Sequence, residues 1–109
     1  MEKDRLDMIL QMLEEDPSDA FLSYAAALEY QKKGLRDEAI QRLQALIAKD
    51  PAYIGSYYQL GKMLEEKSLM DEAIQVYKSG IALAKQQGDA KTLGELKEAL
   101  FIILDDDDW

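Results

Sequence analysis

The sequence of 109 residues contains no cysteine, no histidine and no asparagine. Without cysteine, disulfides and thiolate metal sites are excluded. Without histidine as well, the chain lacks the commonest general base and the usual serine–histidine and cysteine–histidine pairs of nucleophilic catalysis. Serine chemistry assisted by lysine stays formally possible, but the five serines lie in no recognisable motif. We therefore expect a protein that is not an enzyme and that has no cofactor.

Acidic residues are plentiful, but they do not have the spacing of a metal site. Glu14-Glu15-Asp16 and Asp105–Asp108 are uninterrupted runs. A calcium loop needs spaced ligands and a glycine at its bend. We expect no metal site in either run.

Positive charge and long apolar runs are also scarce. The sequence has 13 lysines and arginines and 22 aspartates and glutamates, which gives a net charge of −9. This balance opposes binding to nucleic acid or to an anionic membrane surface, and it suits a soluble protein or one with a basic partner. No run of about 18 apolar residues could span a membrane, and the N-terminus resembles no signal segment. We expect a cytoplasmic protein.

Proline occurs only twice, and its spacing reveals an internal repeat. Pro17 and Pro51 lie 34 positions apart, and each follows an aspartate. The segment 37–41 (Asp-Glu-Ala-Ile-Gln) recurs unchanged at 71–75, which is the same offset. Such a period is typical of helical repeat proteins.

Each repeat predicts two helices. Apolar residues follow the i, i+3, i+4, i+7 pattern of a buried helical stripe, as at Ala39, Ile40 and Leu43. Glycine tolerates the left-handed conformation that closes helices, so Gly34 and Gly88 predict helix ends. We expect a first helix at about 20–33, with Ser18 or Asp19 as its cap. The other three are expected at about 36–49, 52–67 and 70–87.

Two further amphipathic segments flank the repeats. Residues 3–15 and 89–104 read as capping helices, because a terminal repeat otherwise leaves an apolar face in water. We expect the methionines of the first segment, Met8 and Met12, to belong to the core, although an adaptable interaction surface is the alternative. The prediction is an all-α, α-solenoid domain over 1–104, with about six helices, repeats at 17–50 and 51–87, and an acidic tail at 105–109.

These residues resemble the tetratricopeptide repeat family. In that register Ala27 and Gly61 take a small position where two helices approach closely, and Leu43 and Tyr77 take an aromatic position. Ser23 departs from the pattern because it stands where tryptophan is common, whereas Tyr57 fills the same place in the second repeat. The resemblance covers residues 17–87. Its fold signal is specific, but its functional signal is weak because the family has many partners.

The resemblance implies a concave face lined by the first helix of each repeat. It places a candidate partner-binding set there. This set comprises Phe21, Tyr24, Leu28, Tyr58 and Lys62. Aromatic side chains offer a large contact area at low entropic cost. The alternative is that the end helices cover these aromatics and make them core.

The expected function is a non-enzymatic adaptor, scaffold or assembly factor that binds a peptide or helix of a protein partner. Some family members hold carboxylates with a clamp that includes asparagines, which this chain lacks. The alternative is a self-assembling structural protein whose end helices form a homo-oligomer. Three interpretations of Trp109 remain open: a terminus without a role, a linear motif for a partner, or a segment that binds a groove of its own chain or of a second copy.

Overall fold

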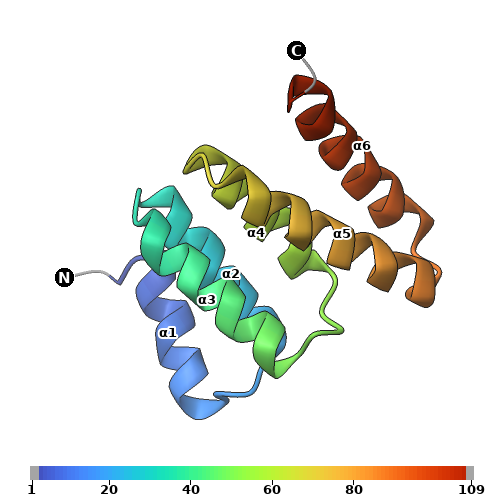
Figure 1. The fold of residues 1–109 in the computed structure, drawn as a ribbon. Helices are drawn as coiled ribbons and strands as arrows, with labels where there is room; N and C mark the ends of the chain where they lie inside the picture. The colour runs from blue at the N-terminus through green and yellow to red at the C-terminus, as the bar shows by residue number, and fades with distance from the viewer. Residues whose placement is uncertain (1–2, 108–109) are drawn as a thin grey trace. The chain divides into compact units, whose positions relative to one another are not determined.

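A computed structural model describes residues 3–107, and within that range the chain forms six α-helices and no strands (Figure 1). The all-α prediction is confirmed. The helices are α1 (Arg5–Glu15), α2 (Ala20–Lys32), α3 (Arg36–Lys49), α4 (Gly55–Glu66), α5 (Met70–Gln87) and α6 (Ala90–Asp107).

The chain divides into two compact units, the first ending at Tyr53 and the second beginning at Ile54. In the first unit, α2 packs against both α1 and α3. In the second, α5 packs against both α4 and α6. Each unit is therefore a helical hairpin with one further helix against it, and the division falls close to the repeat boundary expected at Pro51.

Aspartate side chains cap the first turn of three helices. Asp4, Asp19 and Asp89 accept hydrogen bonds from the backbone N–H three residues later, at 2.9, 2.9 and 3.1 Å. The structure thus selects Asp19 rather than Ser18 as the cap of α2. Such a cap satisfies an N–H that has no partner inside the helix.

Three helices end on a residue in the left-handed region. Gly34, Ser68 and Gly88 have φ values of 80°, 62° and 70°. After each of them, the next N–H bonds a carbonyl five residues earlier, as from Leu35 to Tyr30 at 3.0 Å. These bonds satisfy carbonyls at the helix end. Ser68 is the counterpart of Gly34 in the second repeat, so both repeats close their first helix in the same way.

Two helix bounds differ from the sequence prediction. α4 begins at Gly55 rather than near residue 52, because Pro51 and Ala52 form a turn in which the Tyr53 N–H donates to the Asp50 carbonyl at 3.1 Å. α6 continues past residue 104 to Asp107. Residues 108–109, including Trp109, lie outside the described range.

The core of the second unit pairs large side chains with glycines. Tyr77 is fully buried, and a Cβ on Gly61 would lie 2.2 Å from the Tyr77 ring. A Cβ on Gly80 would lie 2.8 Å from that of Tyr57, which is also buried. Each glycine therefore makes room for one aromatic residue of the neighbouring helix.

The first unit has a smaller aliphatic core. Leu6 and Ile9 of α1 are buried against Ala25 and Ala26 of α2, which confirms the predicted stripe of the N-terminal helix. On α3 the expected apolar stripe is also buried. Its members there are Ala39, Ile40, Leu43 and Leu46.

The methionines of α1 are an exception to this agreement. Met8 and Met12 are 53% and 51% exposed, so the expectation that they belong to the core is wrong. The reason is geometric: α2 covers only the face of α1 that carries Leu6 and Ile9, and the methionines lie on the remaining surface.

Candidate functional site

Three of the predicted partner-binding residues lie together in a surface hollow of the first unit. Phe21, Tyr24 and Leu28 line a hollow of about 130 Å³ on α2, together with Ala25 and three charged side chains. Phe21 is 60% exposed, whereas Tyr24 and Leu28 are half-buried. Since Phe21 reaches solvent, the alternative that this aromatic belongs to the core does not apply to it.

The charged wall of this α2 hollow is an ion-pair cluster. The carboxylate of Glu29 lies 3.1 Å from the Arg5 guanidinium and 3.2 Å from the Lys32 ammonium. The Glu29 side chain is largely buried, but both cations are about 70% exposed. Each cation has further N–H donors that face solvent, so an incoming anionic group can bind either of them while the pair with Glu29 persists.

Tyr24 also contributes to packing. Its ring lies 5.4 Å from that of Tyr53, in a tilted arrangement that aromatic pairs favour. Burial, with smaller contributions from Tyr24, Asp19 and Asp50, raises the pKa of the Tyr53 phenol. Tyr53 is therefore neutral at physiological pH and holds the Tyr24 ring from one side.

The other two predicted residues lie in a hollow of the second unit. Tyr58 and Lys62 of α4 line a space of about 210 Å³. The Lys62 ammonium lies 5.9 Å from the centre of the Tyr58 ring and 3.8 Å from the Glu65 carboxylate. A cation over an aromatic face is attracted by the ring electrons.

The opposite wall of this α4–α6 hollow comes from α6, which sequence reasoning treated only as a cap. The residues missed are Glu95, Glu98, Ala99 and Ile102. Their i, i+3, i+4, i+7 spacing places them on one helix face. This spacing could have identified the face of α6. However, α6 carries no repeat signature that would show which of its faces lies toward α4.

The aromatic Tyr58 also lies near a buried tyrosine of α5. The rings of Tyr58 and Tyr77 are 6.5 Å apart, and the Tyr77 hydroxyl donates a hydrogen bond to Glu65. Burial, followed by this hydrogen bond, strongly raises the pKa of Tyr77. The chain Tyr77–Glu65–Lys62 thus fixes the side of α4 that carries the hollow.

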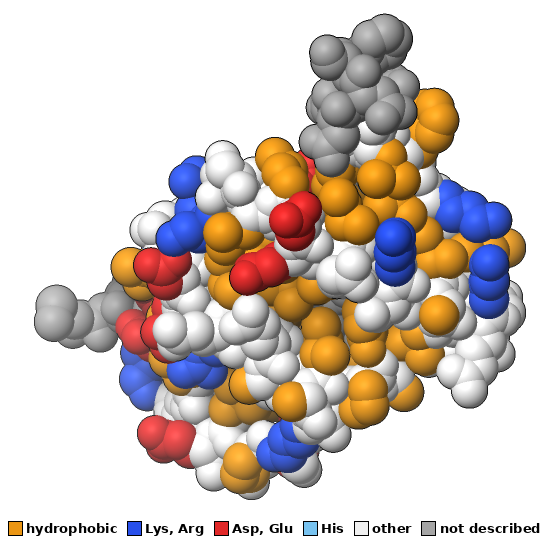
Figure 2. Space-filling view, in the orientation of Figure 1, with side chains coloured by type: hydrophobic (Ala, Val, Ile, Leu, Met, Phe, Trp, Pro, Cys, Tyr) orange, Lys and Arg blue, Asp and Glu red, His pale blue; other side chains and the backbone are white. Residues whose placement is uncertain are grey.

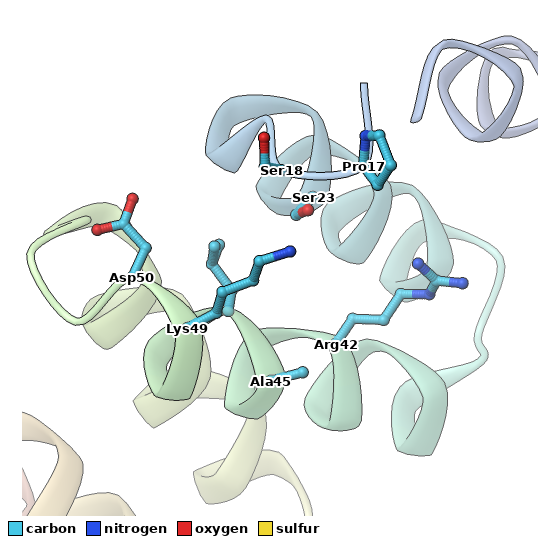
Figure 3. A pocket seen from close by; sticks show the side chains of 8 residues that line it. Pro17, Ser18, Ser23, Arg42, Ala45, Lys49 and Asp50 are labelled. Carbon is cyan, nitrogen blue, oxygen red and sulfur yellow. The ribbon is translucent and has the colours of Figure 1, made fainter. Parts of the chain in front are cut away.

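The first unit has a second hollow that sequence reasoning did not foresee (Figure 3). It has a volume of about 220 Å³ and lies between α3 and the segment that leads into α2. Its lining residues are Pro17, Ser18, Ser23, Arg42, Ala45, Leu46, Lys49 and Asp50. The α3 hollow, as we call it, shares no residue with the α2 hollow.

Neither a metal cluster nor a membrane span occurs in the part of the chain that the structure describes. Between residues 3 and 107, no three acidic side chains are arranged to hold a metal ion. No helix in that range is both long enough and apolar enough to cross a bilayer.

Solved structures of other proteins share this fold. A tetratricopeptide repeat domain protein from Salinibacter ruber is 38% identical to the chain, and its crystal structure gives a TM-score of 0.75. The match covers 78% of this chain and 94% of that protein. Its solution structure gives a TM-score of 0.77 over 80% of this chain and 88% of that one. The chain belongs to the tetratricopeptide repeat family.

A further solved structure is similar to the chain over the flanking helices as well. A protein from Bordetella parapertussis, known from its solution structure, is 25% identical over 97% of this chain and 92% of its own, with a TM-score of 0.84. No family model and no curated protein matches the sequence. Membership in the tetratricopeptide repeat family supports a helical-repeat module for protein interaction in general.

Proposed function

We propose that this chain is a non-enzymatic, cytoplasmic binding module that holds a peptide or helix of a partner protein, as an adaptor or an assembly factor. The observation that carries the proposal is the 60% exposure of Phe21 beside the half-buried Tyr24 and Leu28. A large apolar side chain in a surface hollow with charged neighbours is typical of a binding anchor.

The two hollows on the first helices of the repeats favour different partner groups. In the α2 hollow, the exposed Arg5 and Lys32 can bind a carboxylate of the partner while they remain paired with Glu29. In the α4–α6 hollow, Glu95 and Glu98 face Lys62, which favours a basic group. Charged rims of this kind contribute mainly to specificity and association rate.

A single substitution of the exposed anchor tests the proposal. In capture from native cytosol, Phe21→Ala should reduce partner affinity roughly thirtyfold, which corresponds to a binding hot spot of about 2 kcal/mol. It should leave helicity and thermal midpoint unchanged, because Phe21 is mostly in solvent. Phe101→Ala is the matched control, since Phe101 is 67% exposed on α6 and lines neither hollow.

The outcome depends on comparing the two variants. Loss of capture in Phe21→Ala together with full capture in Phe101→Ala supports the α2 hollow as the binding site. Equal capture by wild type and Phe21→Ala contradicts it, because no other large apolar side chain of this hollow is as accessible.

The second candidate function, self-assembly through the end helices, is favoured by a separate observation. Apolar side chains gather on the surface over α6 (Figure 2), where Phe101, Ile102 and Leu104 are 67%, 50% and 41% exposed. On α1, Met8 and Met12 are also exposed. Exposed apolar stripes on terminal helices favour association between copies. If the chain self-assembles in this way, Phe101→Ala would weaken its self-association, whereas Phe21→Ala would not.

A further inference from the structure

The α3 hollow exists because an aromatic side chain is missing from the first repeat. Ser23 lines this hollow, and its counterpart in the second repeat is Tyr57, whose ring is buried there. Leu46, the counterpart of Gly80, restores only part of the volume, since about 220 Å³ remains open beside it. The vacant space is comparable with one large aromatic side chain.

The charges of the α3 hollow are also peculiar to the first repeat. Lys49 reaches from α3 toward Ser23, while Arg42, at one end of the lining, extends along α3 in the other direction (Figure 3). Their counterparts in the second repeat are Val76 and Leu83, which are apolar. The second repeat therefore has neither the space nor the two cations.

Both cations retain unused hydrogen-bonding capacity. No residue in the described part of the chain forms an ion pair with Lys49. The Arg42 guanidinium lies 4.7 Å from the centre of the Tyr30 ring, and its Nη2 donates to the Tyr30 hydroxyl at 3.4 Å. Its buried Nε lies 3.5 Å from the Glu38 carboxylate and forms no hydrogen bond. An arginine offers five N–H donors, so it can hold one carboxylate and still receive another.

The remaining lining defines what can enter. Pro17, Ala45 and Leu46 form apolar walls, and Asp50 adds one carboxylate. The two cations outweigh that single negative charge. A bulky apolar group can fill the space, while an adjacent anion meets Lys49.

We propose that the α3 hollow binds a segment of a partner protein in which an aromatic residue stands beside acidic residues. The aromatic side chain occupies the volume that Tyr57 fills in the second repeat, and the neighbouring carboxylate pairs with Lys49. This site goes beyond the function proposed above, because it shares no residue with the α2 hollow.

The test uses a capped pentapeptide with a central tryptophan and two aspartates on each side, titrated into the full chain by calorimetry. Lys49→Glu should weaken its binding by about tenfold, since an attractive charge becomes repulsive. Lys78→Glu makes the same change in net charge at an exposed position on α5 and is the matched control.

A second variant fills the hollow instead of changing its charge. Ser23→Tyr restores the aromatic of the second repeat, so it should keep or raise the thermal midpoint while weakening binding of the peptide. A loss of binding in a protein at least as stable as wild type is not explained by unfolding. If Ser23→Tyr fails to fold, the comparison of Lys49→Glu with Lys78→Glu decides alone.

Three results would overturn the proposal. One is equal affinity of wild type and Lys49→Glu for the peptide. Another is equal affinity of wild type for a control peptide with alanine in place of tryptophan. The third is self-association of the wild-type chain that Lys49→Glu abolishes, because the occupant would then be a second copy. Phe21→Ala should bind the pentapeptide normally, so failure of the α2 hollow and failure of this site are distinguishable.

Discussion

At the scale of single residues, the second repeat depends on glycines that face aromatic rings. A Cβ at position 61 would lie 2.2 Å from the ring of Tyr77, which is fully buried and cannot move aside. Gly61→Ala should therefore lower the free energy of unfolding by about 1–3 kcal/mol, the usual cost of overpacking. Urea unfolding followed by circular dichroism measures this. Gly94→Ala, where a Cβ meets nothing within 4 Å, is the control and should not destabilise the protein.

Tyr77 also makes stability depend on alkaline pH. Burial and the hydrogen bond to Glu65 raise the pKa of Tyr77 above its ordinary value of about 10. A raised pKa in the folded state means that its stabilisation is complete below pH of about 10 and is lost as pH rises further. We expect the unfolding free energy to fall above that pH.

Comparison with Tyr77→Phe isolates this effect. The variant should be less stable at neutral pH, because Glu65 loses its donor, but its stability should fall less steeply in alkali. Parallel pH profiles for the two proteins would show that Tyr77 does not carry the dependence.

Individual residues differ in how far the sequence predicts them. The equivalence of Ala27 with Gly61, and of Leu43 with Tyr77, follows from the repeat period, and all four are buried as expected. The α3 hollow was not foreseen, although the departure at Ser23 was visible. A small residue at a large position predicts a void only if the surrounding side chains do not close it, and that depends on packing in three dimensions.

At the scale of helices, caps set where several elements begin. The Asp89 carboxylate accepts the Thr92 N–H at 3.1 Å. The Thr92 side chain, followed by this backbone N–H, lowers the pKa of Asp89. Asp89→Ala should lower the thermal midpoint, because the first turn of α6 loses its cap. Asp71→Ala, in the first turn of α5 but not at a cap, should lower it less. Equal losses in thermal unfolding of the two variants would contradict the capping role.

Helix bounds show where local signals suffice. The closures at Gly34 and Gly88 were predictable, because a left-handed residue ends a helix. The start of α4 was not, because the turn after Pro51 delays the helix without any capping side chain. The α6 wall of the α4–α6 hollow was missed because its role depends on packing against α5.

At the scale of the whole molecule, the two functional proposals differ in oligomeric state. Under the binding function we expect the 12.4 kDa chain to remain a monomer over a wide concentration range, whereas the exposed apolar side chains of α6 favour association under the self-assembly function. Sedimentation equilibrium at several concentrations measures this. Association that Phe101→Glu dissolves, while Lys78→Glu does not, would favour the self-assembly function instead.

The fold was more predictable than the function for a physical reason. The identical five-residue segments at 37–41 and 71–75 identify a repeat of 34 residues, and each repeat buries the same apolar stripe of its second helix. Binding depends instead on which side chains stay in solvent, as Phe21 does and Tyr57 does not. The period of the sequence specifies which residues form the buried stripe, but packing decides which side chains stay in solvent.

The exchange of large and small side chains between the repeats limits how the duplicated hairpins can be recombined. A shuffled hairpin of α2 with α5 would set Ser23 against Gly80 and leave a gap, while Ala27 would meet the Tyr77 ring. Combining α4 with α3 would set Gly61 against Leu43, which is smaller than the Tyr77 ring, and leave a gap there. Helices from the two copies can therefore be interchanged only as complete pairs, although α3 and α5 share the segment Asp-Glu-Ala-Ile-Gln.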